Sequence, residues 1–185
     1  MNTRLHRTAA AALLLSSLLG AQALYAANIS RPDYTAGKDR IAAAYKADKA
    51  ACKPLAGNAR DICNEEATAK EKVARAELEF AHTGTRKDQD HIVTVKADTA
   101  YAVAKERCDD LAGNAKDVCV KEAKAVQTKA LADLKMGQKV GAARSDAMAD
   151  KRDADYKVAA EKCDMLAGDA KTSCVASAKS KFGKS

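Results

Sequence analysis

The stretch CDDLAGNAKDVC, from Cys108 to Cys119, decides the architecture of this chain. It recurs upstream as CKPLAGNARDIC (52–63) and downstream as CDMLAGDAKTSC (163–174). The first cysteines of successive copies lie 56 and then 55 residues apart, and a tyrosine stands seven residues before each of them. A fixed period of this size is typical of a supersecondary unit that is repeated along a chain.

Each repeat unit is predicted to be a helical hairpin. In the second copy, Tyr101, Cys108 and Leu111 share one stripe of a helix. The sequence Leu-Ala-Gly should end that helix, because glycine is the preferred residue at the left-handed C′ position. The Asn or Asp that follows is a strong N-cap for the next helix. The predicted turn and cap residues are therefore Gly57, Asn58, Gly113, Asn114, Gly168 and Asp169.

The two cysteines of each copy are predicted to form a disulfide. Cys108 lies five residues before Gly113 and Cys119 lies five residues after Asn114, so both sit at about the same height above the turn. A bridge requires Cα atoms within about 7 Å, a distance that Ala-rich antiparallel helices can reach near a tight turn. Six cysteines allow fifteen pairings. The repeat makes one of them the simplest: Cys52–Cys63, Cys108–Cys119 and Cys163–Cys174.

The sequence thus predicts an all-α fold of three disulfide-stapled helical hairpins, at residues 33–81, 90–135 and 142–182. Polar or glycine-containing linkers are expected at 82–90 and 136–141. The helices of the hairpins are expected over 33–55, 59–81, 90–111, 115–135, 142–166 and 170–181.

The inward stripes of these helices are narrow. In the second copy, the stripe on the second helix is predicted to be Cys119, Ala123, Val126, Ala130 and Leu134. Such stripes suit a close approach of helices, and they leave open whether the hairpins stack as one bundle, as a short solenoid or not at all.

Two residues of the first copy are expected to disturb its first helix. Gly37 should loosen the helix, because glycine is a poor helix former. Pro54 should kink the helix or end it early, because proline lacks a backbone donor and clashes with the preceding turn.

The N-terminus is predicted to be a secretory signal peptide over residues 1–26. A basic start with Arg4 and Arg7 precedes a short apolar run and small residues, with cleavage expected after Ala23 or Ala26. The alternative is an uncleaved membrane anchor, which is disfavoured because a span needs about 20 apolar residues. We therefore predict a periplasmic location, an oxidising compartment in which disulfides persist, and no transmembrane span in the mature chain.

The charge pattern disfavours nucleic acid as a partner. The chain has 32 Lys and Arg against 25 Asp and Glu, a formal net charge of +7, and the two signs are finely interleaved. Segments that bind nucleic acid instead cluster their basic residues. The partner is left open, with an envelope protein or an anionic envelope component as candidates.

No catalytic constellation is recognisable in the sequence. Only His82 and His91 remain after the signal peptide, both in or beside a predicted linker, and no phosphate-binding or dinucleotide-binding motif is present. Ten residues separate the cysteines of each copy, whereas structural zinc sites use pairs two to four residues apart. We predict no enzyme activity, no cofactor and no metal site.

The repeat pattern Y-x6-C-x2-LAG-[ND]-A-[KR]-x2-C, followed in the first copy by AKEKVARAELE, carries a resemblance over nearly the whole mature chain. It resembles small exported Ala/Lys-rich cysteine-repeat proteins of Gram-negative bacteria, some of them loosely labelled TolA-like cell envelope proteins. The resemblance implies a periplasmic location and no particular activity. TolA itself has a membrane anchor and a folded C-terminal domain, neither of which is recognisable here, so its function is not carried over.

Together these observations predict a non-enzymatic periplasmic helical protein, acting as a cell-envelope-associated binding, structural or stress-related factor. The alternative is a periplasmic redox or metal-handling protein that uses its six cysteines.

Overall fold

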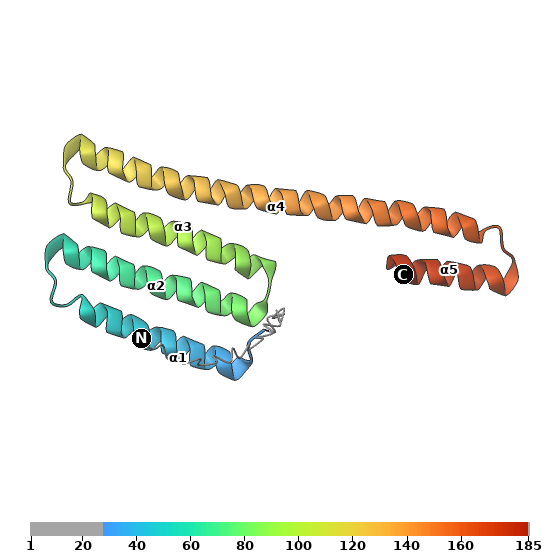
Figure 1. Ribbon diagram of the computed structural model, residues 1–185, viewed down its shortest axis with the longest axis horizontal. Coiled ribbons are helices and arrows are strands. Elements are labelled where there is room, and N and C mark those ends of the chain that lie inside the picture. The colour runs from blue at the N-terminus through green and yellow to red at the C-terminus, as the bar shows by residue number, and fades with distance from the viewer. Residues whose placement is uncertain (1–27, 185) are drawn as a thin grey trace, which may run out of the picture.

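The computed structural model describes residues 28–184, in which every secondary-structure element is a helix. The predicted all-α fold of three stapled hairpins is confirmed. The predicted signal peptide at 1–26 lies outside the described residues. In the order of the chain, the helices in Figure 1 are α1 (Arg31–Ala51), α2 (Gly57–Thr83), α3 (Arg86–Cys108), α4 (Gly113–Cys163) and α5 (Gly168–Phe182).

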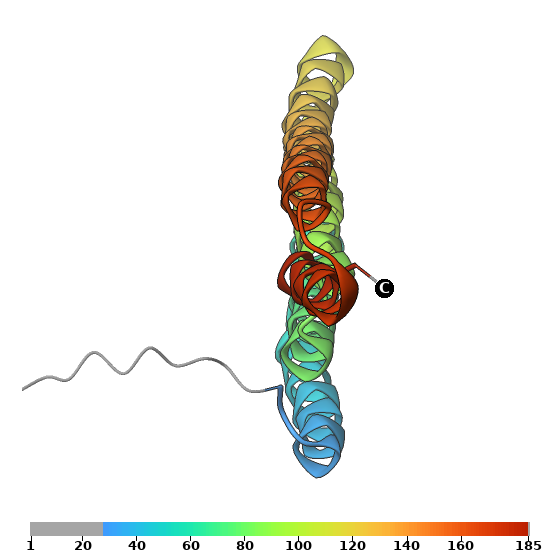
Figure 2. The ribbon, with the colours of Figure 1, turned by 90° about the vertical axis from the view of Figure 1, so that its right-hand side faces the viewer.

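The helices pack as a bundle one layer thick. Over residues 28–184, each helix packs only on the helices that precede and follow it in the chain. Helices α1 to α4 lie side by side, and α5 folds back along the C-terminal part of α4 (Figure 1). Seen after a 90° turn, the molecule is a narrow column of helices (Figure 2). Because the contact stripes are rich in alanine, the buried apolar residues are small: Cys52, Ala67, Ala76, Ala97, Cys108, Cys163 and Ala178.

The glycine of each LAG sequence makes the reversal between the two helices of a hairpin. The φ angles of Gly57, Gly113 and Gly168 are +52°, +53° and +57°. These left-handed values are strained for residues with a Cβ atom but open to glycine. The left-handed conformation predicted for the three glycines is therefore confirmed, but their predicted place at the C′ position is wrong. The first helices of the hairpins end earlier, at Ala51, Cys108 and Cys163, and each glycine is the first residue of the next helix.

The predicted capping role of the next residue is wrong. The second helix of each hairpin begins at the glycine, so its N-cap is an alanine, as at Ala56, and no side chain caps it. The left-handed glycine has already turned the chain, which makes Asn58 the second residue of α2. The Asn58 side chain instead donates from Nδ2 to the carbonyl oxygen of Glu106 at 3.1 Å, which links α2 to the end of α3. Asn114 and Asp169 occupy the equivalent positions in α4 and α5.

The first helix is less disturbed than predicted. Helix α1 runs unbroken through Gly37, which is buried. Leu78 of α2 lies over this glycine, so that a Cβ atom there would be 2.6 Å from Leu78 Cδ1. Helix α1 ends at Ala51, one position earlier in the repeat than the ends of α3 and α4, as expected from Pro54.

The linker predicted at 136–141 is wrong, because α4 continues through it as a single helix of 51 residues. The linker predicted at 82–90 is real but shorter. Only Gly84, with φ +63°, and Thr85 separate α2 from α3. Glycines alone did not break α4: neither Gly137 nor Gly141 has a positive φ.

The face that α4 turns toward α3 also differs from the predicted stripe. Val126 is 66% exposed, whereas its neighbour Gln127 is buried. The inward row is Cys119, Ala123, Gln127, Ala130 and Leu134, so the predicted stripe is correct at four of its five positions and wrong only at Val126, whose place Gln127 takes. Burial of Gln127 is tolerated because its amide is fully paired, as described below.

No helix in the described part of the chain combines the length and the apolar character that crossing a membrane requires.

Candidate functional site: a groove between α2 and α3

The six cysteines form the three predicted bridges, Cys52–Cys63, Cys108–Cys119 and Cys163–Cys174, with Cα–Cα distances of 5.6, 5.7 and 5.6 Å. None of the six is free. The first cysteine of each bridge is buried and the second is half-buried.

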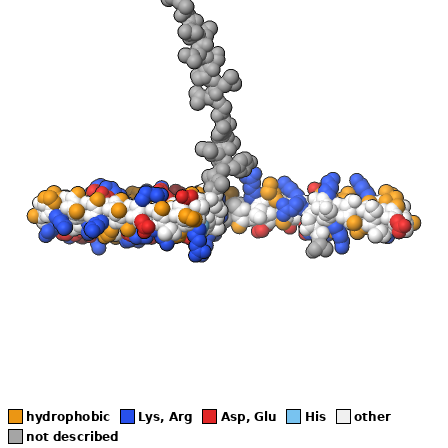
Figure 3. All heavy atoms as spheres, turned by 90° about the horizontal axis from the view of Figure 1, so that it is seen from below, with side chains coloured by type: hydrophobic (Ala, Val, Ile, Leu, Met, Phe, Trp, Pro, Cys, Tyr) orange, Lys and Arg blue, Asp and Glu red, His pale blue; other side chains and the backbone are white. Residues whose placement is uncertain are grey.

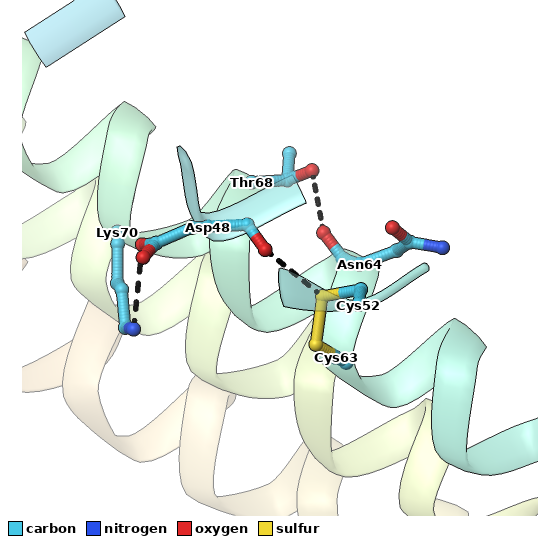
Figure 4. The surroundings of a disulfide bond; sticks show 6 residues. All are labelled: Asp48, Cys52, Cys63, Asn64, Thr68 and Lys70. Atoms are coloured by element: carbon cyan, nitrogen blue, oxygen red, sulfur yellow. Dashed lines mark hydrogen bonds and ion pairs between the residues drawn. A yellow bond between two sulfur atoms is a disulfide. The ribbon is translucent and has the colours of Figure 1, made fainter. Parts of the chain in front are cut away.

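The surroundings of the first bridge show what the staple holds in place. Cys52, at the end of α1, meets Cys63 in the second turn of α2 (Figure 4). One turn away, Lys70 Nζ lies 3.4 Å from the Asp48 carboxylate and adds an exposed ion pair between the same two helices. An exposed pair of this kind contributes little. The bridge is therefore the main local tie between α1 and α2 at this end of the hairpin.

A groove of about 480 Å³ runs between α2 and α3, the two helices that join the first repeat to the second. Its apolar lining comes from Ala76, Val95 and Ala102, with Thr99 beside them. The Thr99 hydroxyl is buried and donates to the Val95 carbonyl oxygen at 2.7 Å, so it is already bonded. The titratable side chains of the lining are Lys72, Arg75, Glu79, His91 and Asp98.

One acidic side chain of the groove, Glu79, is held from α1. The Tyr34 hydroxyl donates to Glu79 Oε2 at 2.5 Å. This hydrogen bond to the carboxylate raises the pKa of Tyr34 above its usual value, with burial and the Glu79 charge adding to the shift. The Tyr34 ring stacks on His82, with the ring centroids 4.6 Å apart. His82 Nδ1 in turn donates to the Ile29 carbonyl oxygen at 3.0 Å. His82 is thus part of the packing between α1 and α2.

The other acidic side chain, Asp98, is held from α4. Gln127 Nε2 donates to Asp98 Oδ1 at 2.6 Å, and Lys124 Nζ donates to Gln127 Oε1 at 2.7 Å. The Lys124 ammonium also lies 5.0 Å from the centre of the Tyr101 ring. This chain of contacts pairs both ends of the buried Gln127 amide and fixes Asp98 at the edge of the groove.

The basic side chains are less constrained. Arg75 Nε pairs with Glu71 on the same helix. Lys72 and His91 are exposed. The groove therefore combines an apolar floor with two acids fixed by neighbouring helices and three basic side chains at its edge. Such a surface can hold a ligand that carries an apolar side chain between charges of both signs.

Sequence reasoning did not find this groove. It lies between helices of different repeats, and the repeat motif carries no signal for how repeats face each other. The available signal was Gln127, a polar residue adjoining an apolar stripe. His91 was noted in the sequence, and the structure places it in the groove, whereas His82 lies outside it. Within residues 28–184, no group of three or more His, Cys, Asp or Glu side chains is arranged to hold a metal ion.

In the comparisons with known proteins, no family model, no curated protein and no solved structure matches this chain.

Proposed function

We propose that the protein is an exported, non-enzymatic scaffold of the cell envelope, which binds a protein partner in the groove between α2 and α3. The observation that carries this proposal is the groove, where an apolar floor lies among two acids held by neighbouring helices and basic side chains at its edge. An anionic lipid or glycan would favour a surface of uniform positive charge. A segment of polypeptide with one apolar side chain and charges of both signs fits this groove better.

The chemistry of the groove supports binding rather than catalysis. Glu79 and Asp98 accept hydrogen bonds from Tyr34 and Gln127, which hold them in place. The one hydroxyl in the lining, on Thr99, is directed to the backbone. A hydroxyl that acts as a nucleophile needs a base within hydrogen-bonding reach. The Thr99 hydroxyl instead donates to the Val95 carbonyl oxygen.

The surface around the groove offers no strong field that would draw a highly charged ligand. Seen from the α1 edge of the layer, both basic and acidic side chains are scattered along the molecule (Figure 3). The ion pairs Lys96–Glu77 and Arg107–Glu66, both between α2 and α3, likewise place charges of opposite sign side by side. The short-range fit of the groove would then determine which partner binds.

Site-specific photo-crosslinking in living cells tests this function. A photoreactive residue replaces Val95 in the groove, and a matched control replaces exposed Lys46 on α1. We expect a discrete protein adduct from position 95 and none from position 46. If only lipid or glycan adducts form, the protein partner proposed here is wrong and an anionic envelope component takes its place. Equal labelling from both positions, or none from either, would overturn the binding function.

The redox or metal-handling alternative is separated from this proposal by counting thiols in the native protein. The structure holds all six cysteines in bridges, with Cys52, Cys108 and Cys163 buried. We expect no free thiol, and peptide mapping should recover the three bridges of the structure. Accessible thiols at neutral pH, or stoichiometric metal, would favour the alternative.

A further inference from the structure

The outer face of α4 is an apolar stripe that no other helix of residues 28–184 covers. It lies on the side of α4 opposite the buried row of Cys119, Ala123 and Gln127, along the open edge of the layer (Figure 1). All its residues are exposed, including Met136 at 61% and Val140 at 63%. We define the outer face of α4 as Val118, Ala125, Ala132, Met136, Val140, Ala143, Ala147, Ala154 and Val158.

The repeat shows which contact this face resembles. The offset of 56 residues maps α2 onto the first half of α4, and the offset of 55 maps α3 onto the second half. Ala76 of α2 and Thr99 of α3 are buried where these helices meet. Their equivalents on α4, Ala132 and Ala154, are both exposed.

Larger side chains repeat this difference. Phe80 and Val103 are half-buried, whereas their equivalents Met136 and Val158 are 61% and 56% exposed. Parts of the two surfaces that meet between α2 and α3 thus recur on one continuous helix, although Val95 and Ala102 of the groove correspond to Asp150 and Lys157. The surface on the first half of α4 cannot contact the surface on the second half, because α4 is one continuous helix through its centre.

The ion pairs across the α2–α3 contact also recur. Glu77 Oε1 lies 2.7 Å from Lys96 Nζ, and Glu66 Oε1 lies 2.5 Å from Arg107 Nη2. The four equivalent positions keep the same signs of charge: Asp133 with Lys151, and Glu122 with Lys162.

One antiparallel register satisfies both of these pairs. From 77 to 66 and from 96 to 107 the chain moves eleven residues in opposite directions, and the same holds from 133 to 122 and from 151 to 162. A helix that places Asp133 beside Lys151 therefore also places Glu122 beside Lys162. In this register Lys135 and Lys139 fall within one residue of Asp150 and Asp146.

We propose that the outer face of α4 binds the outer face of α4 from a second copy of this chain, antiparallel and about a two-fold axis near Ala142. In this dimer each α4 supplies both halves of the contact, so the two ion pairs occur twice. The contact repeats between chains what α2 and α3 do within one chain. This is the geometry of a domain-swapped dimer, in which a straightened hinge replaces an internal contact by an external one.

The mass and shape of the oxidised protein in solution test this proposal. We expect a concentration-dependent dimer in sedimentation equilibrium. In small-angle scattering its longest dimension should be at least the length of α4, about 75 Å for 51 residues. An extended monomer at every concentration would overturn the proposal. So would a compact monomer, because there the second half of α4 would fold back on the first within one chain.

Charge reversal tests the register. Lys151→Glu with Lys162→Glu turns four attractive contacts of the dimer into repulsive ones and should raise its dissociation constant at least about tenfold. Adding Glu122→Lys and Asp133→Lys reverses both sides and should restore the dimer. Lys46→Glu with Lys53→Glu, on and just after α1, changes the net charge equally and should leave the dimer intact. If the double variant dimerises like the parent, or the fourfold variant does not recover, this register is wrong.

A hinge variant tests the origin of the dimer. Val140→Gly with Gly141→Thr introduces at the centre of α4 the Gly84-Thr85 pair that separates α2 from α3. We expect this variant to become a compact monomer, because the outer face of α4 could then close on itself. If it keeps the dimer mass and dimensions of the parent, the swapped arrangement is overturned.

Discussion

The chain reverses direction between α2 and α3, yet it runs straight through the equivalent point of α4. At the first junction Gly84 takes a left-handed φ of +63°, and the Thr85 hydroxyl accepts from the Asp88 amide at 3.1 Å as an N-cap. The Asp88 carboxylate also accepts from Thr83 and Thr85. At the second junction the residues equivalent to Gly84 and Thr85 are Val140 and Gly141.

The difference shows what a turn between long helices requires. Valine is β-branched and strongly disfavours positive φ. Glycine in place of Thr85 removes the capping hydroxyl, and alanine or arginine takes the place of Asp88. Without a left-handed position and a cap, the residues at the centre of α4 follow their neighbours into the helix. Gly137 and Gly141 lower the stability of α4, but neither takes the left-handed conformation that would reverse the chain.

The largest effect should come from giving the first junction the sequence of the second. Gly84→Val with Thr85→Gly places a β-branched residue at positive φ and removes the hydrogen bonds to Thr85. We expect a loss of about 2–4 kcal/mol in the free energy of unfolding, measured by urea denaturation. A loss below about 0.5 kcal/mol would mean that the junction does not depend on the left-handed glycine.

A matched pair of alanine substitutions should show the next largest effect. Ala76→Leu overfills the buried contact between α2 and α3 and should cost about 1–3 kcal/mol of unfolding free energy. Ala132→Leu, at the equivalent exposed position, should change it by less than about 0.5 kcal/mol in dilute solution. Equal costs in dilute monomer would show that the second half of α4 folds back on the first.

Replacing the central glycines of α4 should have the opposite sign. Gly137→Ala and Gly141→Ala should each raise the free energy of unfolding by about 0.5–1 kcal/mol. Both glycines are helical and a Cβ atom at either would contact nothing within 4 Å. Gly84→Ala is the matched control and should destabilise, because its φ is left-handed. The midpoint of urea denaturation measures all three, and a destabilising Gly137→Ala would indicate that α4 bends there.

The smallest effect concerns the pH dependence of the first junction. Hydrogen bonds from Thr83 and Thr85 lower the pKa of Asp88 below its usual value. A carboxyl group with a lowered pKa in the folded state stabilises the fold above its unfolded pKa of about 3.9. This contribution is lost as the pH falls through the lower folded value. Thermal melting from pH 6 downward should therefore show a smaller decline for Asp88→Asn than for the parent. Identical pH profiles would mean that the Asp88 charge contributes nothing to folding.

The sequence was sufficient for the hairpins because each one is specified locally. Cys108, Cys119 and Gly113 lie within twelve residues, and their spacing alone indicates a turn with a bridge across it. The N-cap prediction failed because the left-handed Gly57 is itself the first residue of α2. The N-cap therefore falls on Ala56, a residue type that gives no capping signal in the sequence.

Contacts between repeats could not be predicted in the same way. The burial of Gln127 depends on Asp98, which lies 29 residues away on another helix. The groove depends on how α2 faces α3, and the narrow alanine stripes of these helices allow several orientations. The linker expected at 136–141 is absent because glycine alone does not end a helix. Val140 disfavours a left-handed turn there, and no capping residue starts a new helix.

The three disulfides have a consequence for how the protein matures. Each bridge joins cysteines eleven residues apart, and none ties one hairpin to another. A bridge can therefore close as soon as its own short stretch of chain has met an oxidant, before the later copies have been synthesised or have folded. Oxidation can follow the order of synthesis from the N-terminal to the C-terminal hairpin, and a correct product requires no reshuffling among the six sulfur atoms.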